Sequence, residues 1–111
     1  MATSNSFYEQ VYQLVKLIPE GRVTTYGEIA KVLASPQSSR LVGYAMSKAL
    51  DYDPAIPAHR VVNRKGLLTG AKHFAHPNTM QELLESEGLS IKNHQIQDFD
   101  KYFYNLYKEL I

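Results

Sequence analysis

The most constraining stretch of the sequence is Ile56–Val62, which reads Ile-Pro-Ala-His-Arg-Val-Val. Pro54 and Pro57 fix their own φ angles near about −65° and hold the residues before them in extended conformations. The two β-branched valines that follow favour a strand. The sequence therefore predicts a stiff, non-helical approach to a short buried strand, with His59 and Arg60 held on a rigid backbone.

Periodic apolar residues predict a helix near the N-terminus. Ser6 and Glu9 form the pattern of a capping box, in which each side chain hydrogen-bonds to the backbone N–H of the other residue. Apolar residues then recur at helical spacing along one face, namely Phe7, Val11, Leu14, Val15 and Ile18. Residues 19–21, which read Pro-Glu-Gly, end this helix, and residues 22–24 form a short extended link.

Two more short helices joined by a polar turn are predicted after this link. Thr25 and Glu28 form a second capping-box pattern, and Ser35-Pro36 ends the helix that they begin. Ser38 or Ser39 caps the next helix, which we expect to extend to Leu50. The apolar side chains of this second helix share one face: Val42, Ala45, Met46 and Ala49.

The opposite face of the second helix carries groups that suit a nucleic acid. It presents Arg40, Gly43, Tyr44 and Ser47. A cation and hydroxyls can contact phosphates, and a glycine lets the backbone of a partner come close. Two short helices of this kind predict a helix-turn-helix. The alternative is a helical hairpin that only packs against the core.

Composition sets the class of protein. The chain has 111 residues, which predicts a single domain over residues 1–111. It contains no Cys, so disulfides and thiolate metal sites are excluded and a reducing cytoplasm is expected. Residues 1–20 hold no long apolar run, so neither a signal peptide nor a membrane segment is expected. The net charge of the side chains is +4 over residues 40–76 and −3 over residues 77–111. This distribution indicates either a face that binds an anion or simply an uneven surface charge.

The last third of the chain predicts a helix, an extended segment and a second helix. The first helix begins at residues 77–79, ends at a Gly88 cap and turns three side chains inward, namely Met80, Leu83 and Leu84. Leu89–Ile96 is expected to be extended. A C-terminal amphipathic helix packed on the core is predicted from Phe99, Tyr102, Phe103, Leu106, Tyr107 and Leu110.

Residues 57–61, Pro-Ala-His-Arg-Val, resemble the Pro-Cys-His-Arg-Val reactive segment of O6-alkylguanine-DNA alkyltransferases. Residues 25–30 and 40–46 are similar to the helix-turn-helix of the same family, and the resemblance covers roughly residues 7–89. Ala58 stands where those enzymes carry the reactive Cys. Alkyl transfer to the protein requires a thiolate, which a methyl group cannot replace. The chain therefore resembles the alkyltransferase-like proteins, which bind alkylated guanine without repairing it and of which many carry Trp at this position.

The resemblance implies a fold and a role for each matching residue. The fold would be mostly α with short extended segments, a winged-helix-like helix-turn-helix. Its DNA-binding residues would be Tyr26, Arg40, Gly43 and Ser47. Tyr26 would crowd a phosphate and help to rotate the target nucleotide, and Arg40 would fill the gap left in the base stack. The alkylguanine pocket would be formed by Tyr26, Ala58, Val61 and, from the loop at residues 70–73, Lys72.

The same resemblance implies structural roles at the former active site for His59, Arg60 and Glu87. His73 and His76 lack further ligands, so no metal site is predicted, and no cofactor is expected. The predicted function is a monomeric, cytoplasmic sensor, nucleoid-associated if bacterial. It would bind O6-alkylguanine in duplex DNA through the minor groove, flip the nucleotide out and mark it for nucleotide excision repair. The alternatives are a small helix-turn-helix transcription regulator, an alkyltransferase whose Cys has been replaced by Ala, and a hydrolase that uses His59 and Glu87.

Overall fold

The computed structural model describes residues 6–35 and 37–110, and the mostly helical fold class predicted from the sequence is confirmed. The α-helices are α1 (Phe7–Val15), α2 (Tyr26–Val32), α3 (Ser39–Ser47), α4 (Ala49–Tyr52), α5 (Thr79–Ser86), α6 (Phe99–Tyr102) and α7 (Leu106–Leu110). The strands are β1 (Thr24–Thr25), β2 (Val61–Val62), β3 (Ile91–Lys92) and β4 (Gln95–Ile96), and two 3₁₀ turns are η1 (Ala58–Arg60) and η2 (Ala71–His73). None of the helices in the described residues has the length and apolarity needed to cross a bilayer.

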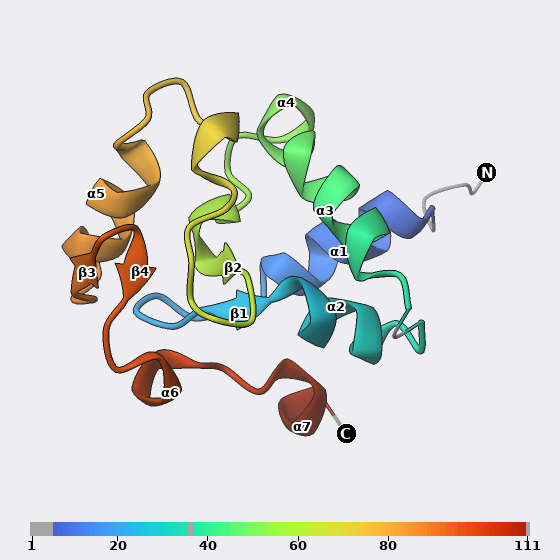
Figure 1. Ribbon diagram of the computed structural model, residues 1–111. Coiled ribbons are helices and arrows are strands. Elements are labelled where there is room, and N and C mark those ends of the chain that lie inside the picture. The colour runs from blue at the N-terminus through green and yellow to red at the C-terminus, as the bar shows by residue number, and fades with distance from the viewer. Residues whose placement is uncertain (1–5, 36, 111) are drawn as a thin grey trace.

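The parallel pair β1–β2 holds the molecule together at its centre (Figure 1). Thr24 pairs with Val61 and Thr25 pairs with Val62. Because successive side chains of a strand point to opposite faces, Val61 packs into one apolar cluster with α1, α2 and α3, and Val62 packs into another with α5 and β4. The pairing also places the start of α2 beside η1, although the two segments lie more than thirty residues apart in the sequence.

Helix α1 begins as predicted and ends earlier than predicted. The capping box is confirmed, because the Glu9 N–H donates to Ser6 Oγ at 3.2 Å and the Ser6 N–H donates to Glu9 Oε1 at 3.4 Å. The helix stops at Val15 instead of continuing to Ile18. Pro19 has no N–H to donate to the Val15 carbonyl, and that carbonyl instead accepts the Ile18 N–H at 3.1 Å in a tighter turn, which explains the early end. Ile18 is nevertheless buried, with 1% of its surface exposed.

The predicted helix-turn-helix is formed by α2 and α3, which pack against each other and against α1. The turn between them includes Pro36, which lies outside the described residues. Thr25 caps α2, because its hydroxyl accepts the Glu28 N–H at 3.0 Å. The predicted capping box is wrong in its second bond, from the Thr25 N–H to the Glu28 carboxylate, which does not form. The Glu28 carboxylate instead accepts the backbone N–H of Tyr107 at 2.7 Å, so it ties α2 to the C-terminal helix.

The helix predicted to extend to Leu50 is broken at Lys48 into α3 and α4. The Tyr12 hydroxyl donates to the Ala45 carbonyl at 2.7 Å, and the Lys48 N–H bonds to the same carbonyl in a tighter three-residue turn. In a regular α-helix the Ala45 carbonyl would accept the Ala49 N–H. The Tyr12 hydroxyl and the Lys48 N–H occupy this carbonyl instead, which explains the break. Ser38 occupies the N-cap position of α3, but its hydroxyl pairs with that of Ser35 and makes no side-chain cap bond.

Two details of α5 and the hairpin differ from the sequence prediction. Met80 and Leu84 are buried, but Leu83 is 38% exposed and does not face the core. Gly88 closes the helix at a φ of +99°, as predicted for a C-terminal cap. The segment expected to be extended is a β3–β4 hairpin, whose turn residues Asn93 and His94 adopt φ angles of 52° and 65°. Such left-handed pairs suit the twist of a tight hairpin.

The predicted C-terminal helix is interrupted between α6 and α7. Val23 donates its N–H to the Tyr102 carbonyl at 3.0 Å and accepts the Tyr104 N–H at 2.7 Å, so residues 103–105 run alongside Val23 as an extended strand-like segment. Backbone groups used in this pairing cannot form helical bonds. Leu106 is fully buried, whereas Tyr107 and Leu110 are 36% and 47% exposed, so only part of the predicted apolar stripe packs on the core.

Candidate nucleic-acid interface

An open groove of about 590 Å³ runs along the outer face of α3. Its lining residues come from α2, α3 and the loop around η2, and they are Tyr26, Ser39, Arg40, Gly43, Tyr44, Ser47, Thr69, Lys72 and His73. Two cations and several hydroxyls face the groove, and none of these lining residues is acidic. The groove therefore brings together all four residues predicted to bind DNA, in an environment that suits phosphate.

Arg40 and Gly43 have surroundings that favour an external partner. Arg40 is exposed, and within residues 6–35 and 37–110 it has no ion pair or side-chain hydrogen bond. Its cation lies in the first turn of α3, where the helix dipole opposes a positive charge. A Cβ added at Gly43 would meet no described atom within 4 Å, so packing inside the chain does not require a glycine there.

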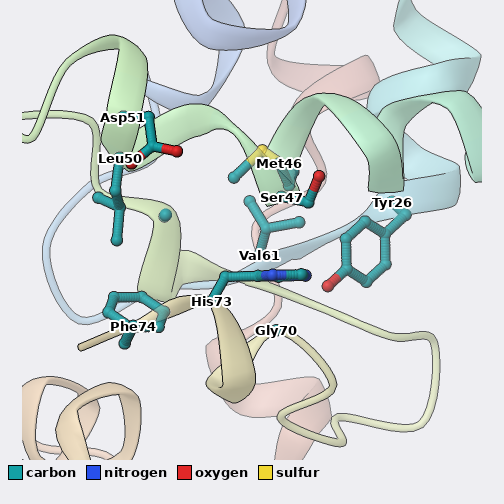
Figure 2. A pocket seen from close by; sticks show the side chains of 10 residues that line it. Tyr26, Met46, Ser47, Leu50, Asp51, Val61, Gly70, His73 and Phe74 are labelled. Atoms are coloured by element: carbon teal, nitrogen blue, oxygen red, sulfur yellow. The ribbon is translucent and has the colours of Figure 1, made fainter. Parts of the chain in front are cut away.

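A small cavity of about 40 Å³ lies next to the groove (Figure 2). It is lined by Tyr26, Met46, Ser47, Leu50, Asp51, Ala58, Val61, Gly70, His73 and Phe74. Tyr26, Ser47 and His73 line both spaces, so the cavity adjoins the groove at these residues.

Three of the four residues predicted for the pocket line this cavity, namely Tyr26, Ala58 and Val61. Lys72, the fourth, lines only the groove outside, and the neighbouring His73 lines the cavity instead. Successive side chains of a 3₁₀ turn point about 120° apart, so η2 cannot direct both residues inward. The sequence analysis also missed Asp51 and Phe74. Asp51 lies four residues after Ser47, a helical spacing that could have found it, whereas no local pattern marks Phe74.

Tyr26 lies where the cavity adjoins the groove. Its hydroxyl lies 3.2 Å from Thr69 Oγ1, which joins α2 to the loop before η2. Burial raises the pKa of Tyr26, and the hydrogen bond with Thr69 offsets only part of that rise, so the phenol stays protonated at neutral pH. A water molecule needs roughly 10–15 Å³ of such space, so the cavity of about 40 Å³ has room for only a few waters. The cavity in this conformation is therefore too small to hold a purine.

Behind the cavity, η1 holds a compact charged cluster on Glu87. His59 Nε2 lies 2.7 Å from Glu87 Oε2, and Arg60 Nη2 lies 2.8 Å from the same oxygen. The Gly21 N–H donates to Glu87 Oε1 at 2.9 Å, and Arg60 Nη1 donates to the Ile18 carbonyl at 2.9 Å. The contact predicted between His59 and Glu87 is thus present. The cluster also engages Arg60, whose side chain is only 16% exposed.

The pKa of Glu87 reflects this cluster. Burial raises the pKa, but the hydrogen bonds from Arg60, Gly21 and His59, together with the charge of His59, outweigh burial and lower the pKa to about 2. The carboxylate is therefore ionised over the whole physiological range and anchors η1 to the end of α5. In the part of the chain that the structure describes, no group of three or more His, Cys, Asp or Glu side chains could hold a metal ion.

A helix-turn-helix with a cationic groove that adjoins a small cavity is typical of a DNA-binding domain. Residues 6–89 match the family described as 6-O-methylguanine DNA methyltransferase, DNA binding domain, and the chain belongs to this family. The resemblance inferred from residues 25–30, 40–46 and 57–61 is confirmed.

Two relatives and one solved structure are similar along most of their length. The DNA base-flipping protein of Escherichia coli K12 is 38% identical over 107 residues, which cover 95% of this chain and 79% of that protein. Alkyltransferase-like protein 1 of Schizosaccharomyces pombe is 40% identical over 87 residues, 78% of this chain and 80% of that protein. The crystal structure of S. pombe Atl1 in complex with damaged DNA containing O6-carboxymethylguanine superimposes with a TM-score of 0.77 at 34% identity, covering 94% of this chain and 98% of that one.

The affinity of the protein for duplex DNA is expected to fall steeply with salt, because cations that neutralise phosphates release bound counterions. The slope of log affinity against log salt concentration should become shallower by roughly 0.9 for each phosphate contact that is removed. Arg40→Ala and Lys72→Ala, both in the groove, should each show this loss in a fluorescence-anisotropy titration. Arg64→Ala, which alters an exposed residue outside the groove, is the matched control. A flat salt dependence of the wild type would contradict the assignment of the groove.

Proposed function

We propose that the protein senses O6-alkylguanine in duplex DNA by binding the lesion and leaving it chemically unchanged. The observation that carries this proposal is Ala58. It lines the cavity beside the intact pair of His59 and Glu87, at the motif position where alkyltransferases carry the reactive Cys. A methyl group can neither ionise nor accept an alkyl group, and no Cys occurs anywhere in the sequence.

The groove and the cavity support a sequence of steps. Helix α3 enters the minor groove, where the degenerate pattern of base edges lets the protein scan without strong sequence preference. Tyr26 crowds a phosphate and the damaged nucleotide rotates out, with Arg40 filling its place in the stack. Unstacking costs a few kcal/mol and is least costly for a badly paired base, which contributes to selectivity. The base then occupies the cavity once Tyr26 and Thr69 separate.

A sensor that leaves the adduct in place needs another activity to remove it. We therefore propose that nucleotide excision repair proteins are the partners that receive the marked lesion. We also propose that the protein is a monomer and acts in the cytoplasm, or at the nucleoid if the source is bacterial. The absence of Cys suits a reducing compartment. Sedimentation of the protein with and without a lesion duplex tests the monomer.

The protein is expected to bind a duplex with one O6-methylguanine more tightly than the unmodified duplex, and the adduct is expected to be recovered unchanged. Binding is measured by anisotropy with both duplexes, and the recovered DNA is digested and separated by chromatography after long incubation. Loss of the methyl group from the DNA would overturn the proposal in favour of an enzyme. Equal affinity for both duplexes together with a preferred DNA sequence would favour a transcription regulator.

A further inference from the structure

Asp51 gives the cavity a negative charge. It is the only acidic residue among the described residues that line the cavity, and most of the other lining side chains are apolar or aromatic. Figure 2 shows Asp51 and Leu50 together at one end of the cavity and Tyr26 at the other. Tyr26 also lines the groove, so Asp51 lies at the end of the cavity away from this residue of the groove.

No described cation neutralises this carboxylate. The ion pairs within residues 6–35 and 37–110 join Lys16 to Asp53, and His59 and Arg60 to Glu87, and none includes Asp51. Lys48 lines a neighbouring cleft with Asp51 without an ion pair between them, and Lys72 lies in the outer groove.

His73 is the remaining basic side chain at the cavity. Burial first, and then the charge of Lys72, lower the pKa of His73 below its ordinary value of 6.5, so at neutral pH the imidazole adds little positive charge. The small volume of the cavity keeps any substituent inside it close to Asp51. The charge that an inserted substituent meets is therefore that of a carboxylate.

We propose that Asp51 is a specificity-determining residue, through which the cavity favours neutral or cationic O6-alkyl groups and disfavours adducts that end in a carboxylate. This inference rests on the proposed function and adds the chemical class of the adduct to it. Like charges brought together in a binding site reduce affinity for the wrong ligand, which is how repulsion creates specificity. Asp51 is an exposed residue at the edge of the cavity, so solvent screens part of the repulsion and the expected discrimination is moderate.

The test uses two adducts of the same shape and different charge. Duplexes with O6-carboxymethylguanine, which is anionic, and with O6-carbamoylmethylguanine, its neutral amide, are titrated alongside the unmodified duplex. The wild type is expected to bind the amide roughly 5- to 10-fold more tightly than the carboxylate. In Asp51→Asn this ratio should fall to about one. Glu82→Gln removes the same charge from an exposed position outside the cavity and should keep the wild-type ratio.

The ratio of affinities separates Asp51 from general electrostatics, since removal of any acid strengthens binding to DNA without discriminating between adducts. Melting temperatures of both variants check that the fold is retained. Equal binding of the two adducts by the wild type, or an unchanged ratio in Asp51→Asn, would overturn this inference and leave the proposed function intact. If neither adduct binds more tightly than unmodified guanine, the proposed function fails, and this inference fails with it.

Discussion

Glu87→Ala is expected to lower the free energy of unfolding by about 3–5 kcal/mol, the cost of removing one partner from a buried ion pair. The Glu87 side chain is 9% exposed and accepts hydrogen bonds from Arg60 and the backbone of Gly21, with His59 in contact at 2.7 Å. Removing the carboxylate leaves the Arg60 guanidinium half-partnered in a largely buried site. Urea unfolding followed by circular dichroism measures the loss.

Glu85→Ala is the matched control, because Glu85 lies in the last turn of α5 close to Glu87, is exposed, and its carboxylate accepts a hydrogen bond only from Gln81 in the described structure. Its effect should stay within about 0.5 kcal/mol, as is usual for surface positions. Glu87→Gln is the milder second variant if Glu87→Ala does not fold. A loss no larger than that of Glu85→Ala would show that the cluster does not stabilise the domain.

The pH dependence of stability provides an independent measurement of the same cluster. The folded pKa of Glu87, about 2, lies below its ordinary value of 4.5. A group whose pKa is lowered by folding stabilises the protein above its unfolded pKa, and this contribution is lost as pH falls toward the folded value. The difference in unfolding free energy between the wild type and Glu87→Gln should therefore be constant above about pH 4.5 and shrink between pH 4.5 and 2. A difference that does not change over this interval would contradict the assignment.

Arg40→Ala is expected to weaken binding to a duplex with O6-methylguanine by about 1–3 kcal/mol, or about 5- to 140-fold, while the melting temperature stays that of the wild type. The side chain makes no ion pair or side-chain hydrogen bond within the described residues, so its removal costs the free protein little. In the complex, the loss includes both the attraction to phosphate and the group that fills the base stack.

The comparison with an unmodified duplex separates these two contributions. Arg64→Ala removes the same charge from an exposed turn outside the groove, and it should weaken binding to both duplexes slightly and equally. Arg40→Ala should reduce the preference for the lesion as well as the affinity. If it binds the lesion as tightly as the wild type, Arg40 is only a surface charge.

The sequence by itself determined those features that depend on neighbouring residues. The capping box of Ser6 and Glu9 forms because its bonds span three residues, and Gly88 ends α5 because its conformation is costly for other residues. The prolines and valines at residues 54–62 determined the stiff approach and the strand in the same way. The resemblance carried by residues 25–30, 40–46 and 57–61 also identified the family, since the motif residues within each segment lie close together in the chain.

Tertiary contacts decided what local patterns could not. The break at Lys48 exists because a hydroxyl from α1, that of Tyr12, takes the Ala45 carbonyl, and the C-terminal helix is split because residues 103–105 pair with Val23. Both bonds join residues more than thirty positions apart, so no periodicity within one segment reveals them.

The cavity shows the same division. The sequence identified Tyr26, Ala58 and Val61 as lining residues. In the structure, η2 places His73 and not Lys72 in the lining, and α4 contributes Asp51. The β1–β2 pair brings α2 to η1, and the packing of α3, α4 and η2 around them closes the cavity. The side chains that line the cavity come from segments that are far apart in the sequence, so the local sequence pattern does not show which of them lie close together.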